Sequence, residues 1–182
     1  MRKEIENGML VTPLPVLLIG TYDENDVPNI MNAAWGVQSD YHEITIYLAQ
    51  HKTTDNLKLH GAFTVSFATR ATVKEADYFG MVSGTKVNKV EKAGFHAFCS
   101  DKVHAPLFEE LPVSIECKVK SLDDEMILIG EVVGLNADES VMTNGKVDLT
   151  KMQPVMFDSS MNVYRVIGEE TGKAFSIGLE LK

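Results

Sequence analysis

The sequence predicts a mostly antiparallel β-barrel with a few short helices on its rim. Segments in which apolar and polar residues alternate, as they do on half-buried strands, recur about seven times in the 182 residues. Most connections between these segments are too short for the crossover that parallel strands require. Short strands joined by tight turns pack most simply as one curled antiparallel sheet.

Hydrophobic patterning places each strand. Residues 16–22 are apolar on both faces, which indicates a strand buried on both sides. At residues 111–120, apolar side chains alternate with polar ones, and Glu116 falls on the polar face. The other regular strands are expected at residues 28–35, 44–49, 62–67 and 126–134, with shorter or less regular ones at 95–99, 151–158 and 163–167.

The helical patterns are short. One, at residues 54–60, is followed by Gly61, a residue that commonly ends helices in the left-handed conformation. A second, at residues 72–79, opens with the Thr-x-x-Glu pattern of a capping box, and a helical turn is expected at residues 90–93. The tail at residues 172–178 contains glycines and is expected to close over the body of the barrel.

Length and composition indicate one globular domain spanning residues 1–182, with a polar lead-in at residues 1–12. The net charge of −9 argues against nucleic acid, which requires a basic face, and against an anionic membrane surface. The first apolar run, residues 14–19, is too short for a signal peptide or a membrane span. Cys99 and Cys117 form no Cys-x-x-Cys pair and are expected to be reduced structural thiols, so we expect a cytoplasmic protein.

Residues 50–56 lie between an expected strand and an expected helix, and their side chains suit an anion. Lys52, Thr53 and Thr54 carry ammonium and hydroxyl groups that can donate to phosphate oxygens. The helix N-terminus adds free N–H groups and a partial positive charge. A simpler role fits the same residues, in which Thr53 or Thr54 caps the helix and Asp55 complements its dipole. These residues alone leave both roles open.

The common sequence signatures of a catalytic centre do not occur in this chain. The five histidines have no metal-ligand spacing, because none lies three or four residues from another. Residues 80–86 superficially resemble a P-loop, but they are one residue short and follow a helical pattern instead of a strand. Neither Gly-x-Gly-x-x-Gly nor Gly-x-Ser-x-Gly occurs. We therefore expect no metal and no catalytic side chain, and assign any chemistry to a bound cofactor.

Two loops and one strand offer the groups that such a cofactor would contact. Residues 50–56 and residues 83–89 both combine lysine with hydroxyl side chains, which suit a phosphate and the edge of a ring. Asn29, Asn32 and Trp35 lie on the second expected strand, beside two small alanines that would let a flat ligand approach the backbone. Trp35 alone also fits a place in the core or at an interface.

Several short motifs follow one another in an order and spacing typical of one known family. These motifs are Pro13-x-Pro15, Asn29-x-x-Asn-Ala-Ala-Trp35, Lys52-Thr-Thr-Asp-Asn56, Phe63-Thr-Val-Ser66, Tyr78-Phe-Gly80, Ser83-Gly-Thr-Lys-Val-Asn-Lys89, Tyr164 and Phe175-x-x-Gly178. Over about residues 10–178 the chain resembles the flavin reductase-like, FMN-binding split-barrel family, which includes flavoredoxins and NAD(P)H:FMN oxidoreductases.

This resemblance implies a split β-barrel in which three segments hold FMN. The turn after the third strand would bind the phosphate, the backbone of the second strand would run beside the flavin, and the second polar loop would approach the cofactor. In that order, the implied residues are Lys52, Thr53, Thr54 and Asn56; Asn32, Ala33, Ala34 and Trp35; and Ser83, Gly84, Lys86 and Lys89. A lysine near the pyrimidine end would stabilise negative charge on reduced flavin.

The reaction that the resemblance implies is hydride transfer from NADH or NADPH to bound FMN, followed by electron transfer to a small-molecule or protein acceptor. The hydride would pass from nicotinamide C4 to flavin N5, so no side-chain base is required. A homodimer with FMN near the subunit interface is also implied. Three alternatives remain: an FMN electron carrier without efficient NAD(P)H oxidation, an enzyme similar to pyridoxamine phosphate oxidase, and a barrel whose ligand site has decayed. The second is disfavoured because no arginine cluster is present to bind a second phosphate.

Overall fold

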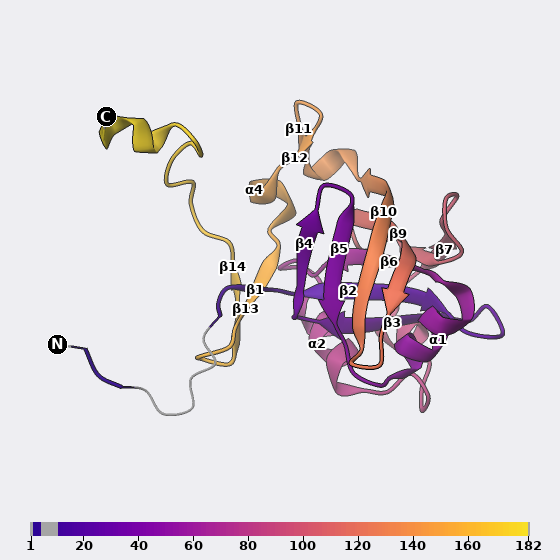
Figure 1. The fold of residues 1–182 in the computed structure, drawn as a ribbon. Helices are drawn as coiled ribbons and strands as arrows, with labels where there is room; N and C mark the ends of the chain where they lie inside the picture. The colour runs from indigo at the N-terminus through magenta and orange to yellow at the C-terminus, as the bar shows by residue number, and fades with distance from the viewer. Residues whose placement is uncertain (1, 5–10, 182) are drawn as a thin grey trace.

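Seven strands form one antiparallel sheet that curls into a half-barrel (Figure 1), which confirms the predicted fold class. The structure is a computed structural model and describes residues 2–4 and 11–181, so most of the lead-in expected at residues 1–12 lies outside the described residues. Along the sheet the strands are β3 (Pro28–Ala33), β2 (Leu17–Tyr22), β6 (Ala62–Phe67), β9 (Val113–Leu122), β10 (Ile127–Ala137), β5 (Glu43–Tyr47) and β4 (Gly36–Asp40).

The sheet must curl because β3 and β4 lie at its opposite ends and yet follow each other directly in the chain. Only Ala34 and Trp35 separate them. The three Cα–Cα steps from Ala33 to Gly36 span at most about 11 Å, so the two edges of the sheet meet at this point. Gly36 opens β4 where a Cβ atom would lie 2.5 Å from the side chain of Leu17, too close for any other residue without a shift. Trp35 therefore marks the seam of the barrel.

The core lies on both faces of the sheet. Leu17 and Ile19 of β2 belong to a buried cluster with residues of β5, β6, β9 and β10, whereas Leu18 packs with residues of the two helices that cover the other face. Both faces of β2 are buried, as its unbroken apolar sequence predicts.

Smaller strands and short helices complete the described chain. The strands are β1 (Leu14–Pro15), β13 (Val155–Asp158) and β14 (Val163–Val166), which form a second sheet, and the pairs β7 (Ala97–Cys99) with β8 (Pro106–Phe108) and β11 (Met142–Thr143) with β12 (Lys146–Val147). The helices are α1 (Lys52–His60), α2 (Val73–Met81), α3 (Lys89–Ala93) and α4 (Leu149–Met152), with 3₁₀ turns at Glu139–Val141 and Ile177–Leu181. Among the described residues, no helix is long and apolar enough to span a membrane.

Three local predictions are wrong. Strand β4 was not expected, because its side chains are mostly polar and exposed and so give no alternation signal. Part of the strand expected at residues 151–158 is helix α4, which starts where the Asp148 carboxylate accepts hydrogen bonds from the N–H groups of Thr150 and Lys151. The capping box expected at the start of α2 does not form, since the Thr72 hydroxyl instead accepts from the Thr69 N–H.

The C-terminal tail does not close over the body, contrary to the sequence prediction. Beyond β14 the chain runs away from the barrel as an extended arm that ends in a 3₁₀ turn (Figure 1). The arm carries fully or largely exposed apolar side chains, among them Phe175, Ile177 and Leu181. Glycine flexibility permitted either path, and the sequence holds no further signal that distinguishes them.

Candidate functional site

The turn that was predicted to bind an anion leads directly into α1. The helix begins at Lys52, two residues earlier than expected, and His51 is its N-cap. The Thr54 hydroxyl accepts a hydrogen bond from the His51 N–H and donates one to the His51 carbonyl, at 2.9 and 2.7 Å. Thr54 thus completes the cap from the third helical position, and its hydroxyl is occupied by that role. The first N–H groups of the helix remain oriented outward from its N-terminus.

Thr53 and Asn56 hold the helix against the sheet. The Asn29 side-chain amide donates to the Thr53 hydroxyl at 2.9 Å, and the Asn56 amide donates to the Thr21 hydroxyl at 2.9 Å. All four side chains are buried. Because Thr53 acts as an acceptor towards Asn29, its own hydroxyl hydrogen stays available to a ligand. Asn56 positions the turn, whereas Thr53 can both position it and donate.

Lys52 is half-buried and forms an ion pair of 2.7 Å with the Asp23 carboxylate. Burial raises the pKa of Asp23, but hydrogen bonds from Lys52 and from the N–H groups of Asn25 and Val27 outweigh burial and leave the pKa below its ordinary value. The ionised Asp23 carboxylate therefore holds the Lys52 ammonium in place beside the start of α1. The sequence showed Asp23 only as part of a polar turn, and its pairing with a residue 29 positions away had no local signal.

The second predicted loop, residues 83–89, packs beside the start of α1. A Cβ atom on Gly84 would lie 2.2 Å from the Asn29 side-chain oxygen and 3.4 Å from the Lys52 side chain, so the loop backbone packs directly on β3 and on the first residue of α1. Ser83 stabilises the loop itself through its hydroxyl, which lies 2.8 Å from that of Thr85. Lys86 points into solvent. The two loops that the sequence singled out are therefore neighbours in space.

Lys89 is the most unusual residue of this site. It is 5% exposed, its ammonium donates to the Phe79 carbonyl at 3.0 Å, and among the described residues it forms no ion pair. Burial, with a further contribution from the positive charge of Lys52, lowers the pKa of Lys89 to about 8. Two cations that repel each other beside a helix N-terminus leave an excess of positive charge, which an anion would compensate.

The strand that was predicted to lie beside the flavin shows a mixed arrangement. The Asn32 side chain turns towards α2 and donates to the Ala76 carbonyl at 2.8 Å, so only its backbone is available. Ala33 and Ala34 are partly exposed, and Trp35 is 57% exposed at the barrel seam. Small, partly exposed residues next to an exposed aromatic ring suit a flat ligand or a second protein chain.

Gly84→Ala should lower the stability of the protein by about 1–3 kcal/mol, because the new methyl group overlaps Asn29 and disturbs its bond to Thr53. Gly80→Ala is the matched control. A Cβ atom there meets nothing closer than 3.5 Å, and Gly80 lies inside α2, so alanine should leave stability unchanged or raise it by up to about 1 kcal/mol. Urea unfolding of both variants measures the difference, and equal stabilities would show that the two loops are not packed together.

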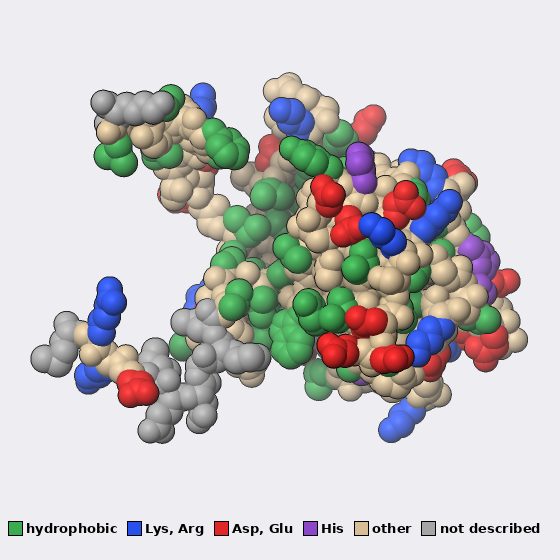
Figure 2. All heavy atoms as spheres, viewed as in Figure 1, with side chains coloured by type: hydrophobic (Ala, Val, Ile, Leu, Met, Phe, Trp, Pro, Cys, Tyr) green, Lys and Arg blue, Asp and Glu red, His purple; other side chains and the backbone are tan. Residues whose placement is uncertain are grey.

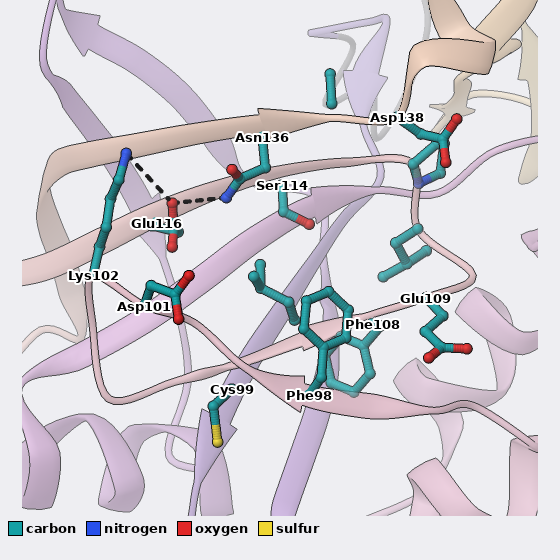
Figure 3. Close-up of a pocket in the computed structure, with 14 residues that line it drawn as sticks. Phe98, Cys99, Asp101, Lys102, Phe108, Glu109, Ser114, Glu116, Asn136 and Asp138 are labelled. Carbon is teal, nitrogen blue, oxygen red and sulfur yellow. Dashed lines mark hydrogen bonds and ion pairs between the residues drawn. The ribbon is translucent and has the colours of Figure 1, made fainter.

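A separate cavity of about 720 Å³ lies beneath the β7–β8 hairpin and involves none of the predicted site residues (Figure 3). Its floor holds Glu116, which is 2% exposed and accepts a hydrogen bond from Asn136 at 2.7 Å, with the Lys102 ammonium 4.0 Å away. The Ser100 hydroxyl also donates to this carboxylate. Alternation places Glu116 on the polar face of its strand, and the structure buries it there because the β7–β8 hairpin covers that part of β9.

The fold and the site together define a split-barrel protein with two lysines, Lys52 and Lys89, near the start of a helix. Residues 9–158 match the family model described as the flavin reductase like domain, so the chain belongs to the flavin reductase-like family. This confirms the family resemblance.

Solved structures agree with this assignment. The flavoredoxin of Desulfovibrio vulgaris (Miyazaki F) is 35% identical, with a TM-score of 0.94 over 98% of this chain and 100% of that one. A flavoredoxin from Methanosarcina acetivorans is 27% identical, with a TM-score of 0.90 over 100% of both chains. An FMN-binding domain of a flavin reductase-like enzyme from Shewanella baltica, 22% identical over 87% of this chain and 88% of that one, shares the fold with a TM-score of 0.78.

Proposed function

We propose that the protein is an FMN-binding oxidoreductase that accepts hydride from NADH or NADPH on the bound flavin and passes electrons to a second acceptor. The observation that carries this proposal is the convergence of Lys52, the buried Lys89 and the N-terminus of α1. Two lysine ammonium groups and the free N–H groups of a helix N-terminus suit a phosphate group. Membership of the flavin reductase-like family and the similarity to two flavoredoxins support FMN as the molecule that carries this phosphate.

The phosphate would be held by Lys52, by the Thr53 hydroxyl and by the first N–H groups of α1. Thr54 and Asn56 would act by fixing this turn, since their side chains are used within the protein. Lys89 would supply positive charge to the anionic cofactor from the second loop. When bound, FMN would supply the hydride-accepting centre, while these residues bind and orient it.

The backbone from Asn32 to Trp35 would face the ring system, and Ser83, Gly84 and Lys86 would line the opposite loop. Their partial exposure beside the cationic turn supports this arrangement. No side chain is assigned a proton-transfer role, because hydride transfer requires only that donor and acceptor stack in register.

Anaerobic mixing of the flavin-loaded protein with NADH, and separately with NADPH, tests the reaction. We expect the flavin absorption to bleach at a rate in the ordinary turnover range, ~1–10³ s⁻¹. Bleaching by dithionite but by neither nicotinamide at such rates would contradict NAD(P)H oxidation and would favour the alternative, an FMN electron carrier that resembles flavoredoxin.

We also propose a homodimer. Hydrophobic side chains gather on the side of the barrel that faces the C-terminal arm (Figure 2), and a groove of about 520 Å³ there is lined by apolar residues, about half of them from β1, β9, β13 and α4. The arm presents Phe175 and Leu181 to solvent, and Trp35 is exposed at the seam. Exposed apolar surface of this extent is typical of an interface between protein chains.

Trp35→Glu should convert the dimer to a monomer, because a carboxylate would be buried without a partner at the interface. Leu59→Glu is the control, since Leu59 is also 57% exposed but lies on α1, away from the seam. Light scattering coupled to gel filtration measures both masses. A wild-type monomer, or a Trp35→Glu variant that remains dimeric, would contradict the interface.

A further inference from the structure

The fold brings together two histidines and one aspartate that lie far apart in the sequence. His60 ends α1, Asp26 lies in the turn between β2 and β3, and His104 lies between β7 and β8. One ligand-type atom from each residue lies within 4.8 Å of those of the other two. The spacing of histidines along the chain gives no sign of this cluster, because His60 and His104 are 44 positions apart.

Each of these side chains is already oriented by a neighbour. His60 Nε2 lies 3.1 Å from the Asp23 carbonyl; donation there leaves Nδ1 with the lone pair that a metal needs. A ligand histidine typically donates its other ring N–H to a carbonyl or carboxylate in this way. Asp26 holds His104 in place, because the Asp26 Oδ1 atom lies 2.9 Å from His104 Nε2. The centroid of the His104 ring lies 5.2 Å from that of the Tyr22 ring.

The separations suit a small divalent cation. Ligand atoms around a tetrahedral Zn²⁺ are about 3.3 Å apart, given bonds of about 2.0–2.1 Å. The Asp26 and His104 atoms already lie within that separation, and the two imidazole rings meet edge to face with centroids 4.7 Å apart. Small rotations of the exposed Asp26 and His104 side chains would bring their ligand atoms to the same distance from a ligand nitrogen of His60.

Space for a fourth ligand adjoins the cluster. An open cleft of about 310 Å³ is lined by His104, Tyr22 and Cys99. Two imidazoles and one carboxylate with an open position is a ligand set that binds Zn²⁺ and chemically similar divalent transition metals.

We propose that Asp26, His60 and His104 form a binding site for a divalent transition-metal ion of the Zn²⁺ type. The ion takes the place of the hydrogen that joins His104 Nε2 to Asp26, and in the neutral imidazole that hydrogen moves to Nδ1. The bound ion joins the β2–β3 turn, the end of α1 and the β7–β8 loop, and so stabilises the folded chain. None of its three ligands is among the residues proposed to hold FMN, although Asp23 contacts both sites: its carboxylate pairs with Lys52, and its carbonyl lies 3.1 Å from His60 Nε2.

The test is Zn²⁺ titration of the full chain, free of an affinity tag and stripped with a chelator, by calorimetry and by thermal unfolding. We expect one ion per chain and a higher unfolding temperature with Zn²⁺. His104→Ala and the double variant His60→Ala with His104→Ala should each weaken binding by at least about tenfold and remove the thermal shift. His104 lies in an exposed loop, so its substitution leaves the core intact.

His96→Ala is the matched control. His96 is also an exposed histidine, paired with a carboxylate, that of Glu110, at 2.7 Å, and it lies outside the cluster. Its substitution should leave Zn²⁺ affinity and the thermal shift unchanged. Equal Zn²⁺ binding by the double variant, absence of saturable binding by the wild type, or loss of binding in Cys99→Ser but not in the histidine variants would each overturn the proposal.

Discussion

Replacing Lys52 with alanine should weaken FMN binding by between about 10-fold and 150-fold. A hydrogen bond to a charged group contributes about 1.5–3 kcal/mol, and every 1.4 kcal/mol changes a dissociation constant tenfold. Lys52 carries the positive charge in the first turn of α1, is partly exposed and is held in place by Asp23 at 2.7 Å. Its loss removes this interaction with the phosphate and leaves the Asp23 carboxylate facing an anion.

Two controls distinguish the loss of the contact between Lys52 and the phosphate from the loss of one positive charge and from the effect of an unpaired Asp23 carboxylate. Lys58→Ala removes the same charge from an exposed position in the last turn of α1 and should leave FMN affinity within about twofold of wild type. Lys52→Ala combined with Asp23→Asn removes the unpaired carboxylate, and should recover part but not all of the affinity. Titration of flavin fluorescence measures each variant. Unchanged affinity in Lys52→Ala would favour a barrel whose ligand site has decayed.

Lys89→Met should have opposite effects on stability and on FMN binding. A pKa lowered from 10.5 to about 8 means that keeping the buried side chain charged at neutral pH costs about 3 kcal/mol. Methionine fills similar space without charge, so the flavin-free protein becomes more stable. FMN binding should weaken at least tenfold, since a positive charge near the anionic cofactor is lost.

The lowered pKa of Lys89 determines how the stability of the protein and its FMN affinity should change with pH. Below pH 8 Lys89 is charged in both the folded and the unfolded state, and the cost of burying the charge is fully present. Between about pH 8 and 10.5 the unfolded chain binds more protons than the folded one, so the contribution of Lys89 to stability rises with pH. FMN affinity falls over the same range, because the folded lysine loses its charge.

Lys86→Met provides the comparison, since Lys86 belongs to the same loop but points into solvent. Urea unfolding and FMN titration from pH 7 to 10 should show both trends in wild type and in Lys86→Met, and neither in Lys89→Met. A Lys89→Met variant that is less stable at pH 7 than wild type would contradict the assignment of Lys89 as a destabilising buried cation.

The sequence was sufficient for those parts of the fold that have a local pattern. The alternation on β6 and β9, the apolar run of β2 and the glycine after α1 are each properties of a few consecutive residues, and each prediction holds in the structure. The two polar loops were also recognised from local chemistry, and they meet at Gly84 and Lys52.

What the sequence could not supply depends on contacts between distant residues. Asp23 pairs with Lys52, Lys89 is buried beside another cation, and Glu116 is covered by a hairpin, although each has the local pattern of a solvated charge. Thr54 was expected to offer its hydroxyl to a ligand, and the structure uses that hydroxyl within the helix cap. The partners of these side chains are set by the tertiary structure, so no periodic pattern in the sequence predicts them.

The central claim is that the cationic turn at the start of α1 holds FMN, and the visible absorption spectrum of the purified protein tests it most directly. We predict the absorption bands of oxidised flavin, retained through gel filtration or acquired on adding FMN, with one FMN per chain released on denaturation and identified by mass. A colourless protein that fails to bind FMN in titration would contradict the account.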